Sequence, residues 1–199
     1  MSGSNAIVTG AARPFGAEIV AALRAEGYVV TAFDDPTHLL TEGAGTTDIA
    51  VLVINAPVTE TNQPFDSITD AEFEDALADQ LYDLVAVAQA VLPKLLRGGR
   101  IVNVGSRGHL GAWGGAHLMA ASAAMAGMTR SMALELAAHG ISVNHVAAGF
   151  AGTSWDTPEN RRYVANTVCH LAASDTGLVG ETLIVDGGRS LRMSESRRR

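Results

Sequence analysis

Residues 5–16 read NAIVTGAARPFG, a short apolar strand that runs into a turn with glycines at positions 10 and 16. The residues after this turn predict a helix over 17–26, and YVVTAF at 28–33 predicts a second strand. Glycines between a strand and a helix let the backbone turn sharply and approach a phosphate group, which binds at the helix N-terminus. This stretch therefore predicts a phosphate-binding turn at the start of an α/β fold.

The remaining sequence continues to alternate strands with helices. Further strands are expected at 49–54, 100–104, 141–147 and 181–185. Helices are expected from the capping box at Thr69 toward Leu96, over 115–138, and from the Thr157-Pro158 start to about Ala172. Apolar strands that alternate with helices indicate a parallel sheet covered on both faces. The prediction is one doubly wound α/β domain of the Rossmann type over residues 1–188, followed by a basic tail at 189–199.

Composition limits the classes of protein to which this chain can belong. Its 199 residues are 47% hydrophobic and 18% charged, which suits one domain with a real core and excludes disorder. Cys169 is the one cysteine, so no disulfide framework is expected and no metal is predicted. The net charge of −7 argues against nucleic acid as a partner, and the short apolar runs argue against a membrane. Because the first residues carry no signal-peptide pattern, we expect a cytoplasmic protein.

Asp34 stands at the end of the second expected strand. A carboxylate at that place can hold the two hydroxyls of an adenosine ribose and repel a 2′-phosphate. The order of strand, glycine turn, helix, strand and acid therefore predicts a dinucleotide site that favours NAD over NADP.

Further motifs resemble the short-chain dehydrogenase/reductase family over nearly the whole chain. INAP at 54–57 is similar to the NNAG element of the family, and IVNVGS at 101–106 is similar to its serine-bearing strand end. AGMTRSMALEL at 126–136 resembles the catalytic helix, while ISVNHVAAGF at 141–150 and VDGG at 185–188 resemble the next two strand ends. The resemblance implies a Rossmann-type fold and these cofactor-binding residues: Gly10, Arg13, Phe15, Gly16, Asp34, Asn55 and Thr153.

The same resemblance leaves the binding of NAD open. Pro14 replaces the middle glycine of the family's turn and removes an N–H group, and Phe15 is expected to add bulk beside the phosphate path. Pro57 and Ala148 also depart from the family pattern.

The catalytic residues of the family are the clearest departure. Members transfer a hydride with a Ser, an Asn and a YxxxK pair, in which the Tyr is a general acid or base and the Lys lowers its pKa. No tyrosine in this chain has a lysine four residues later, and Lys94 is the one lysine. Counting back from GMTR at 127–130, the family positions of Tyr, Lys and Asn hold Leu118, Ser122 and Gln80, and Ser106 alone is kept. Carbonyl reduction through this constellation is therefore expected to fail.

Two segments are shorter than the resemblance implies. About a dozen residues separate the second strand from the strand at 49–54, so the usual third strand, at the edge of the sheet, is expected to be missing. Residues 36–47 are expected to hold at most one helical turn. After Phe150, the substrate-covering helices of the family are reduced to residues 151–156.

Three functions remain open from the sequence. The first is a non-catalytic subunit of a homo-oligomer, or of a hetero-oligomer with a related subunit, joined through the helices at 70–96 and 115–138. The apolar residues expected to be exposed in a monomer are Leu81, Leu84, Val85, Val87, Ala88 and Val91. The second is an enzyme of altered chemistry that uses Ser106 with His109 or His117. The third is a dinucleotide-responsive sensor or scaffold.

Overall fold

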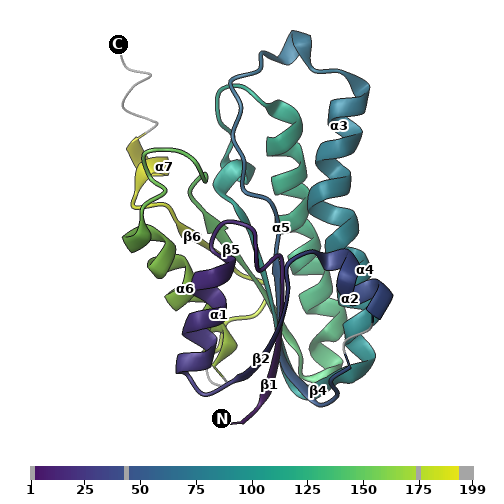
Figure 1. Cartoon of the computed structure of the whole chain (residues 1–199). Helices are drawn as coiled ribbons and strands as arrows, with labels where there is room; N and C mark the ends of the chain where they lie inside the picture. Colours follow the sequence, from purple (N-terminus) through teal and green to yellow (C-terminus); the bar gives the residue numbers. More distant parts are fainter. Residues whose placement is uncertain (1–2, 43–44, 174–175, 193–199) are drawn as a thin grey trace.

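Six parallel strands form one sheet in the computed structural model, which describes residues 3–42, 45–173 and 176–192 (Figure 1). The strand order is β2-β1-β3-β4-β5-β6, and each neighbouring pair is parallel. The strands are β1 Asn5–Thr9, β2 Val29–Phe33, β3 Ile49–Asn55, β4 Leu95–Ser106, β5 Ser142–Ala148 and β6 Thr182–Val185. The predicted doubly wound α/β fold is confirmed.

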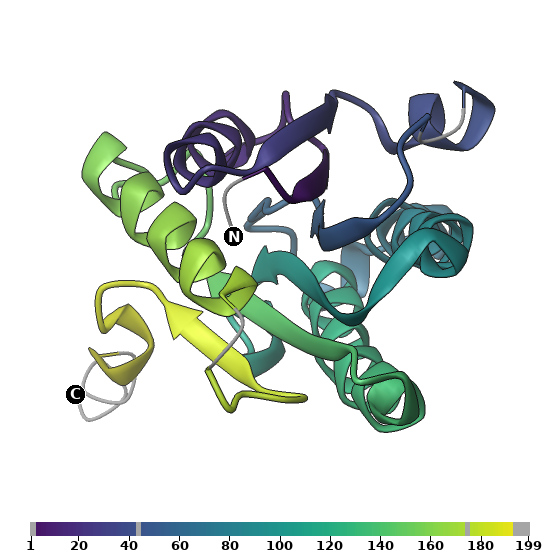
Figure 2. The same cartoon turned by 90° about the horizontal axis from the view of Figure 1, so that it is seen from below.

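Helices cover both faces of this sheet (Figure 2). One face carries α1 (Gly16–Ala25) and α6 (Pro158–Ala172), and the other carries α2 (Pro36–Glu42), α3 (Asp70–Leu77), α4 (Asp83–Val91) and α5 (Ala116–Leu136). Residues Arg189–Arg192 form the helical turn α7, while 193–199 of the basic tail lie outside the described residues. No helix among the described residues is long and apolar enough to cross a bilayer.

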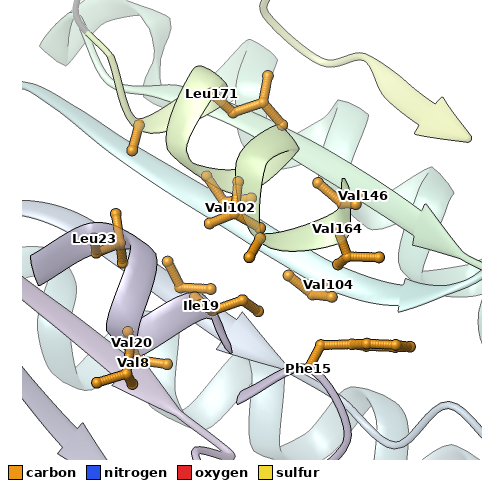
Figure 3. Packing of buried hydrophobic residues seen from close by; sticks show 14 of the residues in the cluster. Val8, Phe15, Ile19, Val20, Leu23, Val102, Val104, Val146, Val164 and Leu171 are labelled. Carbon is orange, nitrogen blue, oxygen red and sulfur yellow. The ribbon is translucent and has the colours of Figure 1, made fainter. Parts of the chain in front are cut away.

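The core on the α1–α6 side holds the glycine turn in place (Figure 3). Phe15, Ile19 and Leu23 come from the turn and α1, and they pack with Val164 and Leu171 of α6 against the valines of the central strands. All five of these side chains are fully buried. At roughly 1.5–3 kcal/mol for each buried side chain of this size, this packing fixes α1 against α6 and so fixes the turn that precedes α1.

The winding of the chain reverses at β1, which has β2 on one side and β3 on the other. In doubly wound sheets a ligand binds at such a point, in the crevice outside the carboxyl ends of the strands. The ends of β1 and β3 therefore mark where a nucleotide site is to be sought.

The edge of the sheet agrees with the sequence, but the connection behind it does not. β2 is the edge strand, and no strand beyond it is formed by residues 36–42 or 45–47, so the predicted loss of the third strand is confirmed. The expectation of one helical turn at most was wrong, because α2 has seven residues. Leu39 anchors this helix in the core on the α4 side of the sheet, and tertiary burial of this kind overrides a weak local propensity.

The long helix predicted from Thr69 also differs in its course. The capping box between Thr69 and Glu72 is present, but a π-helical turn at Ala78–Tyr82 separates α3 from α4. The prediction that the helix runs to Leu96 was wrong, because β4 begins at Leu95, which pairs with Ile49. The α-helix ends at Val91, and a 3₁₀ turn at Leu92–Lys94 leads into β4, because Pro93 has no N–H to continue the α-helical hydrogen bonds.

Candidate functional site

The glycine turn is held against the end of β3 by backbone contacts that leave no room for side chains. Gly10 has a φ of +67°, and a Cβ there would lie 2.3 Å from the Asn55 carbonyl oxygen. A Cβ on Gly16 would lie 2.4 Å from the Ala11 oxygen. The Nδ2 of Asn55 donates to the carbonyl oxygens of Gly10 and Pro14, at 2.9 Å each. Gly10, Gly16 and Asn55 are therefore brought together, and this arrangement needs glycine whether or not a ligand binds.

Arg13 and Phe15, the two bulkier residues of the turn, point to different places. The Arg13 guanidinium lies 3.2 Å from the Asp83 carboxylate at the start of α4 and donates to the Asn55 carbonyl at 3.2 Å. Phe15 adopts a φ of +72° and turns its fully buried ring into the α1–α6 core. The expectation that this ring adds bulk beside the phosphate path is not met, because the left-handed backbone at Phe15 directs the side chain inward.

Asp34 lies on the surface immediately after β2. The Ala11 amide donates to the Phe33 carbonyl at 3.0 Å, so the glycine turn and the end of β2 are neighbours. Residue 34 therefore follows directly after the point where β2 meets the turn, and its exposed side chain is of the type that binds ribose hydroxyls in this fold. The residues at this end of the crevice fit an adenosine.

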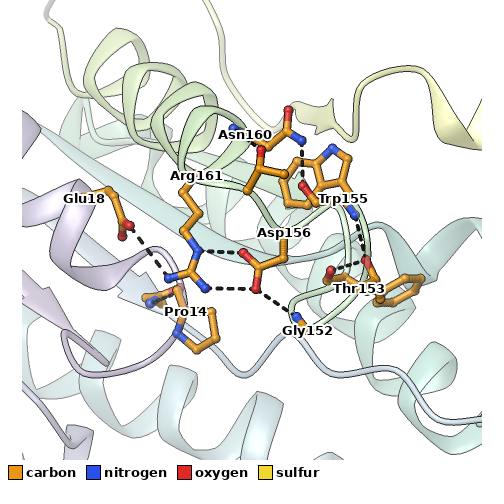
Figure 4. Close-up of polar contacts among 11 residues, drawn as sticks. Pro14, Glu18, Gly152, Thr153, Trp155, Asp156, Asn160 and Arg161 are labelled. Atoms are coloured by element: carbon orange, nitrogen blue, oxygen red, sulfur yellow. Dashed lines mark hydrogen bonds and ion pairs between the residues drawn. The ribbon is translucent and has the colours of Figure 1, made fainter.

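The other end of the crevice is crossed by residues 151–156, which we call the strap (Figure 4). The Ala151 amide donates to the Val58 carbonyl at 3.1 Å, and so links the segment after β5 to the segment after β3. Thr153 Oγ1 donates to the Phe150 carbonyl at 2.8 Å and accepts from the Trp155 amide at 3.3 Å. The hydroxyl of Thr153, which the resemblance implies to be cofactor-binding, thus takes part in the turn of the strap itself.

An ion pair fastens the strap to α6 and α1. Arg161 donates to both oxygens of the Asp156 carboxylate, at 2.6 and 2.9 Å, and lies 3.8 Å from Glu18 of α1 (Figure 4). Asp156 also accepts from the Gly152 amide at 2.9 Å. The Arg161 guanidinium and this amide lower the pKa of the Asp156 carboxyl below its ordinary value, so the pair is charged at neutral pH.

Trp155 and its neighbours fill the space under the strap. The indole lies against Gly149, since a Cβ on that glycine would be 2.4 Å from the ring, and its ring centroid is 5.9 Å from that of Phe15. Beside it, the Arg107 guanidinium stacks 4.8 Å from the Phe150 ring centroid and lies 3.7 Å from the Asp186 carboxylate. The space under the strap is therefore filled by side chains of the chain itself, whereas Asp34 at the other end is exposed.

Three of the four residues that the sequence resemblance assigns to the family's catalytic positions form one buried polar cluster. Ser106 at the end of β4 and Ser122 on α5 share a hydrogen bond of 2.7 Å between their hydroxyls. Ser122 Oγ also lies 3.2 Å from the Gln80 Oε1 and 3.0 Å from the Leu118 carbonyl oxygen. The π-helical turn carries Gln80 into this cluster, which we call the serine cluster: Gln80, Ser106 and Ser122, each at most 3% exposed.

The serine cluster has hydrogen-bonding capacity but no acid or base. Hydroxyl and amide groups do not titrate near neutral pH, and the half-buried Leu118 side chain is a hydrocarbon. Gly108 closes the cluster from above, where its amide donates to Ser106 Oγ at 3.1 Å and a Cβ would lie 2.8 Å from Ser122 Oγ. The cluster can hold its own groups in place, and it offers no proton to a substrate.

The histidines do not form a nucleophile–base pair with Ser106. The Nδ1 atoms of His109 and His117 have no hydrogen-bond partner among the described residues, and Ser106 Oγ is shared between Ser122 and Gly108. His109 instead faces His145 of β5, with ring centroids 6.1 Å apart. Burial lowers the pKa of His145 to about 3 and also lowers the pKa of His109, so both are neutral at pH 7.

Sequence reasoning missed the residues that close the crevice. Trp155, Asp156 and Arg161 lie in a short segment and the first turns of a helix, where no spacing rule predicts that they meet. The one available signal was the short connection between β5 and α6, residues 149–157, because nine residues that lead to a helix on the other face must cross the strand ends directly. No group of three or more His, Cys, Asp or Glu side chains suited to a metal occurs in the described parts of the chain.

The surface between α4 and α5 also differs from expectation. Leu84, Val87, Ala88 and Val91 are buried within the single chain, so the expectation that a monomer exposes them was wrong. They pack against β3 and α2, and the extra helix α2 supplies the cover that the sequence did not reveal. What remains is a groove of about 330 Å³ between the two helices, which we call the α4–α5 groove; it includes Val85, Gln89, Met128, Met132 and Glu135.

Comparison with known proteins gives consistent matches. A family described as enoyl-(acyl carrier protein) reductase matches residues 30–161. The chain is 36% identical over 162 residues to the 3-oxoacyl-[acyl-carrier-protein] reductase FabG of Vibrio harveyi, a match that covers 70% of this chain and 66% of the relative. It is 35% identical over 164 residues to the (2S)-[(R)-hydroxy(phenyl)methyl]succinyl-CoA dehydrogenase subunit BbsD of Thauera aromatica, covering 72% of this chain and 66% of that protein.

Solved structures agree with the fold. A short-chain dehydrogenase/reductase from Serratia marcescens superposes with a TM-score of 0.81 at 24% identity, over 95% of this chain and 98% of that one. A short chain dehydrogenase family protein from Francisella tularensis gives a TM-score of 0.79 at 19% identity, over 96% and 100% of the two chains. At these identities both structures show the fold alone. The chain thus shares their whole architecture, while its sequence matches span just under two thirds of the first relatives' length.

Proposed function

The chain belongs to the short-chain dehydrogenase/reductase family, and from that membership we propose that it is a non-catalytic subunit of an oligomer. Its own hydride-transfer site has lost the groups that move a proton. We place the oligomer in the cytoplasm, as suits a chain with a single cysteine.

The observation that carries this proposal is the serine cluster. Reduction of a carbonyl needs a hydride at carbon and a proton at oxygen, and a positioned acid supplies the proton. Ser122 and Leu118 stand where the family resemblance implies Lys and Tyr, and the hydroxyls of Ser106 and Ser122 bond to each other. The site therefore has no acid of suitable pKa, and its remaining donors are occupied within the protein.

Purified protein should not oxidise NADH or NADPH in the presence of a 3-oxoacyl thioester, the class of substrate named for the FabG relatives. The absorbance of the reduced nicotinamide is followed over hours and compared with a blank without protein. Turnover by the wild type that is lost in Ser106→Ala would overturn the proposal and favour an enzyme of altered chemistry.

Two observations support assembly with a second subunit. The α4–α5 groove presents Val85, Met128 and Met132 on two neighbouring helices. Unbranched methionine side chains adapt to partners that differ in detail. The BbsD relative is itself named a subunit. The partner is a second copy of this chain or another short-chain dehydrogenase subunit.

A nucleotide-responsive scaffold is a second candidate, favoured by the exposed Asp34 beside a turn that keeps Gly10 and Gly16. Such a scaffold would bind NAD and not NADP, because Asp34 repels a 2′-phosphate. Calorimetric titration with both nucleotides distinguishes it from a subunit that binds neither. Tighter binding of NADP would show that a cation such as Arg13 captures the phosphate.

A further inference from the structure

The strap crosses the ends of the strands on one side of the glycine turn. Its first residue, Ala151, bonds to Val58 after β3, although it follows β5, so the strap passes over the end of the intervening strand β4. Its last residue, Asp156, is bound to Arg161, which also reaches Glu18 in the first turn of α1 (Figure 4). The strap is thus tied to β3, to α6 and to α1.

Trp155 occupies the space that this strap encloses, and it is 3% exposed. The indole spans from Gly149 after β5 to Gly187 after β6, where a Cβ on either glycine would lie 2.4 or 3.5 Å from ring atoms. On its other side it meets the ring of Phe15 at the start of α1. The indole therefore stands between the glycine turn and the ends of β5 and β6.

A second set of side chains fills the adjoining space. Arg107 after β4 stacks on Phe150 after β5 and pairs with Asp186 after β6. Asp186 in turn accepts from the amides of Gly188 and Ser190, at 2.9 and 2.7 Å. These contacts join the ends of three strands, and they do so independently of Trp155.

We propose that Trp155 sets the nucleotide specificity of this chain by occupying the space that the nicotinamide ring of a bound dinucleotide would need. A dinucleotide in this fold places its adenosine ribose at the acid after the second strand and its pyrophosphate at the first helix. Its other half must then continue toward the ends of β4 and β5, where the strap and the indole lie. The chain accepts nucleotides by their adenosine diphosphate end and gains no affinity from a nicotinamide.

Trp155 and the ion pair contribute to the exclusion of a nicotinamide in different ways. The indole of Trp155 excludes the nicotinamide because it fills the space, while the ion pair of Arg161 and Asp156 holds the strap in place. Leucine at 155 keeps apolar contact with Phe15 and frees the space over Gly149. The chain offers a matched control, because Trp113 is 72% exposed and lies outside the strap.

The test is calorimetric titration of wild type, Trp155→Leu and Trp113→Leu with NAD⁺ and with ADP-ribose, which lacks the nicotinamide. Wild type and Trp113→Leu should bind the two ligands with affinities within about twofold of each other. Trp155→Leu should bind NAD⁺ about tenfold more tightly than wild type does, with an unchanged affinity for ADP-ribose. The proposal would be overturned if Trp155→Leu bound NAD⁺ no better than wild type does. Undetectable binding of NAD⁺ by both proteins counts as this outcome. A wild type that prefers NAD⁺ to ADP-ribose by tenfold or more would overturn the proposal too.

If Trp155→Leu does not fold, Arg161→Ala removes the ion pair that fastens the strap and substitutes no side chain of the core, with Arg162→Ala on the same helix as its control. In a Trp113→Phe background, Trp155 is the one remaining tryptophan, so its fluorescence reports on the strap directly. Arg161→Ala should make Trp155 accessible to acrylamide and raise the affinity for NAD⁺, and Arg162→Ala should do neither. An unchanged affinity for NAD⁺ in an opened strap contradicts the proposal. The absence of turnover is a separate claim, because Trp155→Leu still has no proton donor at position 118.

Discussion

At the residue scale, the hydrogen bonds of the serine cluster are expected to stabilise the folded protein. Ser122 Oγ lies within hydrogen-bond distance of Ser106 Oγ, Gln80 Oε1 and the Leu118 carbonyl oxygen, all away from water. Its single hydrogen is available to the two acceptors, Gln80 and Leu118, while Ser106 can donate to it. Ser122→Ala should lower the free energy of unfolding by about 1–3 kcal/mol, because Gln80 Oε1 loses a buried donor. The control is Ser131→Ala on the same helix, an exposed residue whose loss should change stability by less than about 0.5 kcal/mol. Urea unfolding that gives equal losses for the two variants would show that the cluster is not a stabilising unit.

His145 gives the protein a pH dependence of known sign. Burial, and secondarily the charge of His109, lowers its pKa from 6.5 to about 3. Between pH 6.5 and about 3, His145 is therefore protonated in the unfolded chain and neutral in the folded chain. The lowered pKa of His145 therefore contributes to the free energy of unfolding fully above pH 6.5. This contribution is lost as the pH falls toward 3, and the loss is about 2 kcal/mol at pH 5. His145→Gln should flatten the unfolding free energy between pH 6.5 and 4, and His139→Gln, at an exposed site, should not. Parallel pH profiles for the two variants would contradict the assignment.

At the scale of single elements, the glycine turn requires glycine, whereas α5 holds a glycine at a position that has room for a side chain. Gly10 has a positive φ and lies against the Asn55 backbone, whereas a Cβ on Gly127 in α5 would meet nothing within 4 Å. Gly10→Ala should lower the free energy of unfolding by about 3 kcal/mol or more. Gly127→Ala should raise the free energy of unfolding by about 0.5–1 kcal/mol. Thermal and urea unfolding measure both. A tolerated alanine at position 10 would mean that the turn is not held as described.

The sequence was sufficient for the strands and for the capped helices, because apolar period and capping residues act locally. Thr69 and Thr157 both cap the helices predicted to follow them. It was not sufficient where tertiary contacts decide. The π-helical turn that buries Gln80, the helix α2 behind Leu39 and the inward ring of Phe15 all depend on neighbours distant in sequence. The family positions in the serine cluster could be located by counting, but their hydrogen bonds to one another could not.

At the scale of the whole molecule, the α4–α5 groove is the surface expected to meet a partner. Val87 is fully buried, so a charge there would unfold the chain and would not report on assembly. Met132→Glu places the charge in the groove instead and should convert a dimer to a monomer that remains folded. Leu134→Glu, on the same helix but 82% exposed, should leave the assembly intact. Light scattering reads the mass of each, and a wild type that is monomeric at micromolar concentration would remove the support for a homo-oligomer.

We propose that this family member does not transfer hydride by itself, and an isotope label on the nicotinamide would reveal any transfer that it makes. The protein is incubated with NADH and NADPH deuterated at both positions of nicotinamide C4, together with a 3-oxoacyl thioester, and the product is examined by mass spectrometry. We predict no deuterated 3-hydroxyacyl product above a blank without protein, because neither Leu118 nor the serine cluster can protonate the carbonyl oxygen. Deuterated product formed by the wild type and absent with Ser106→Ala would contradict the account.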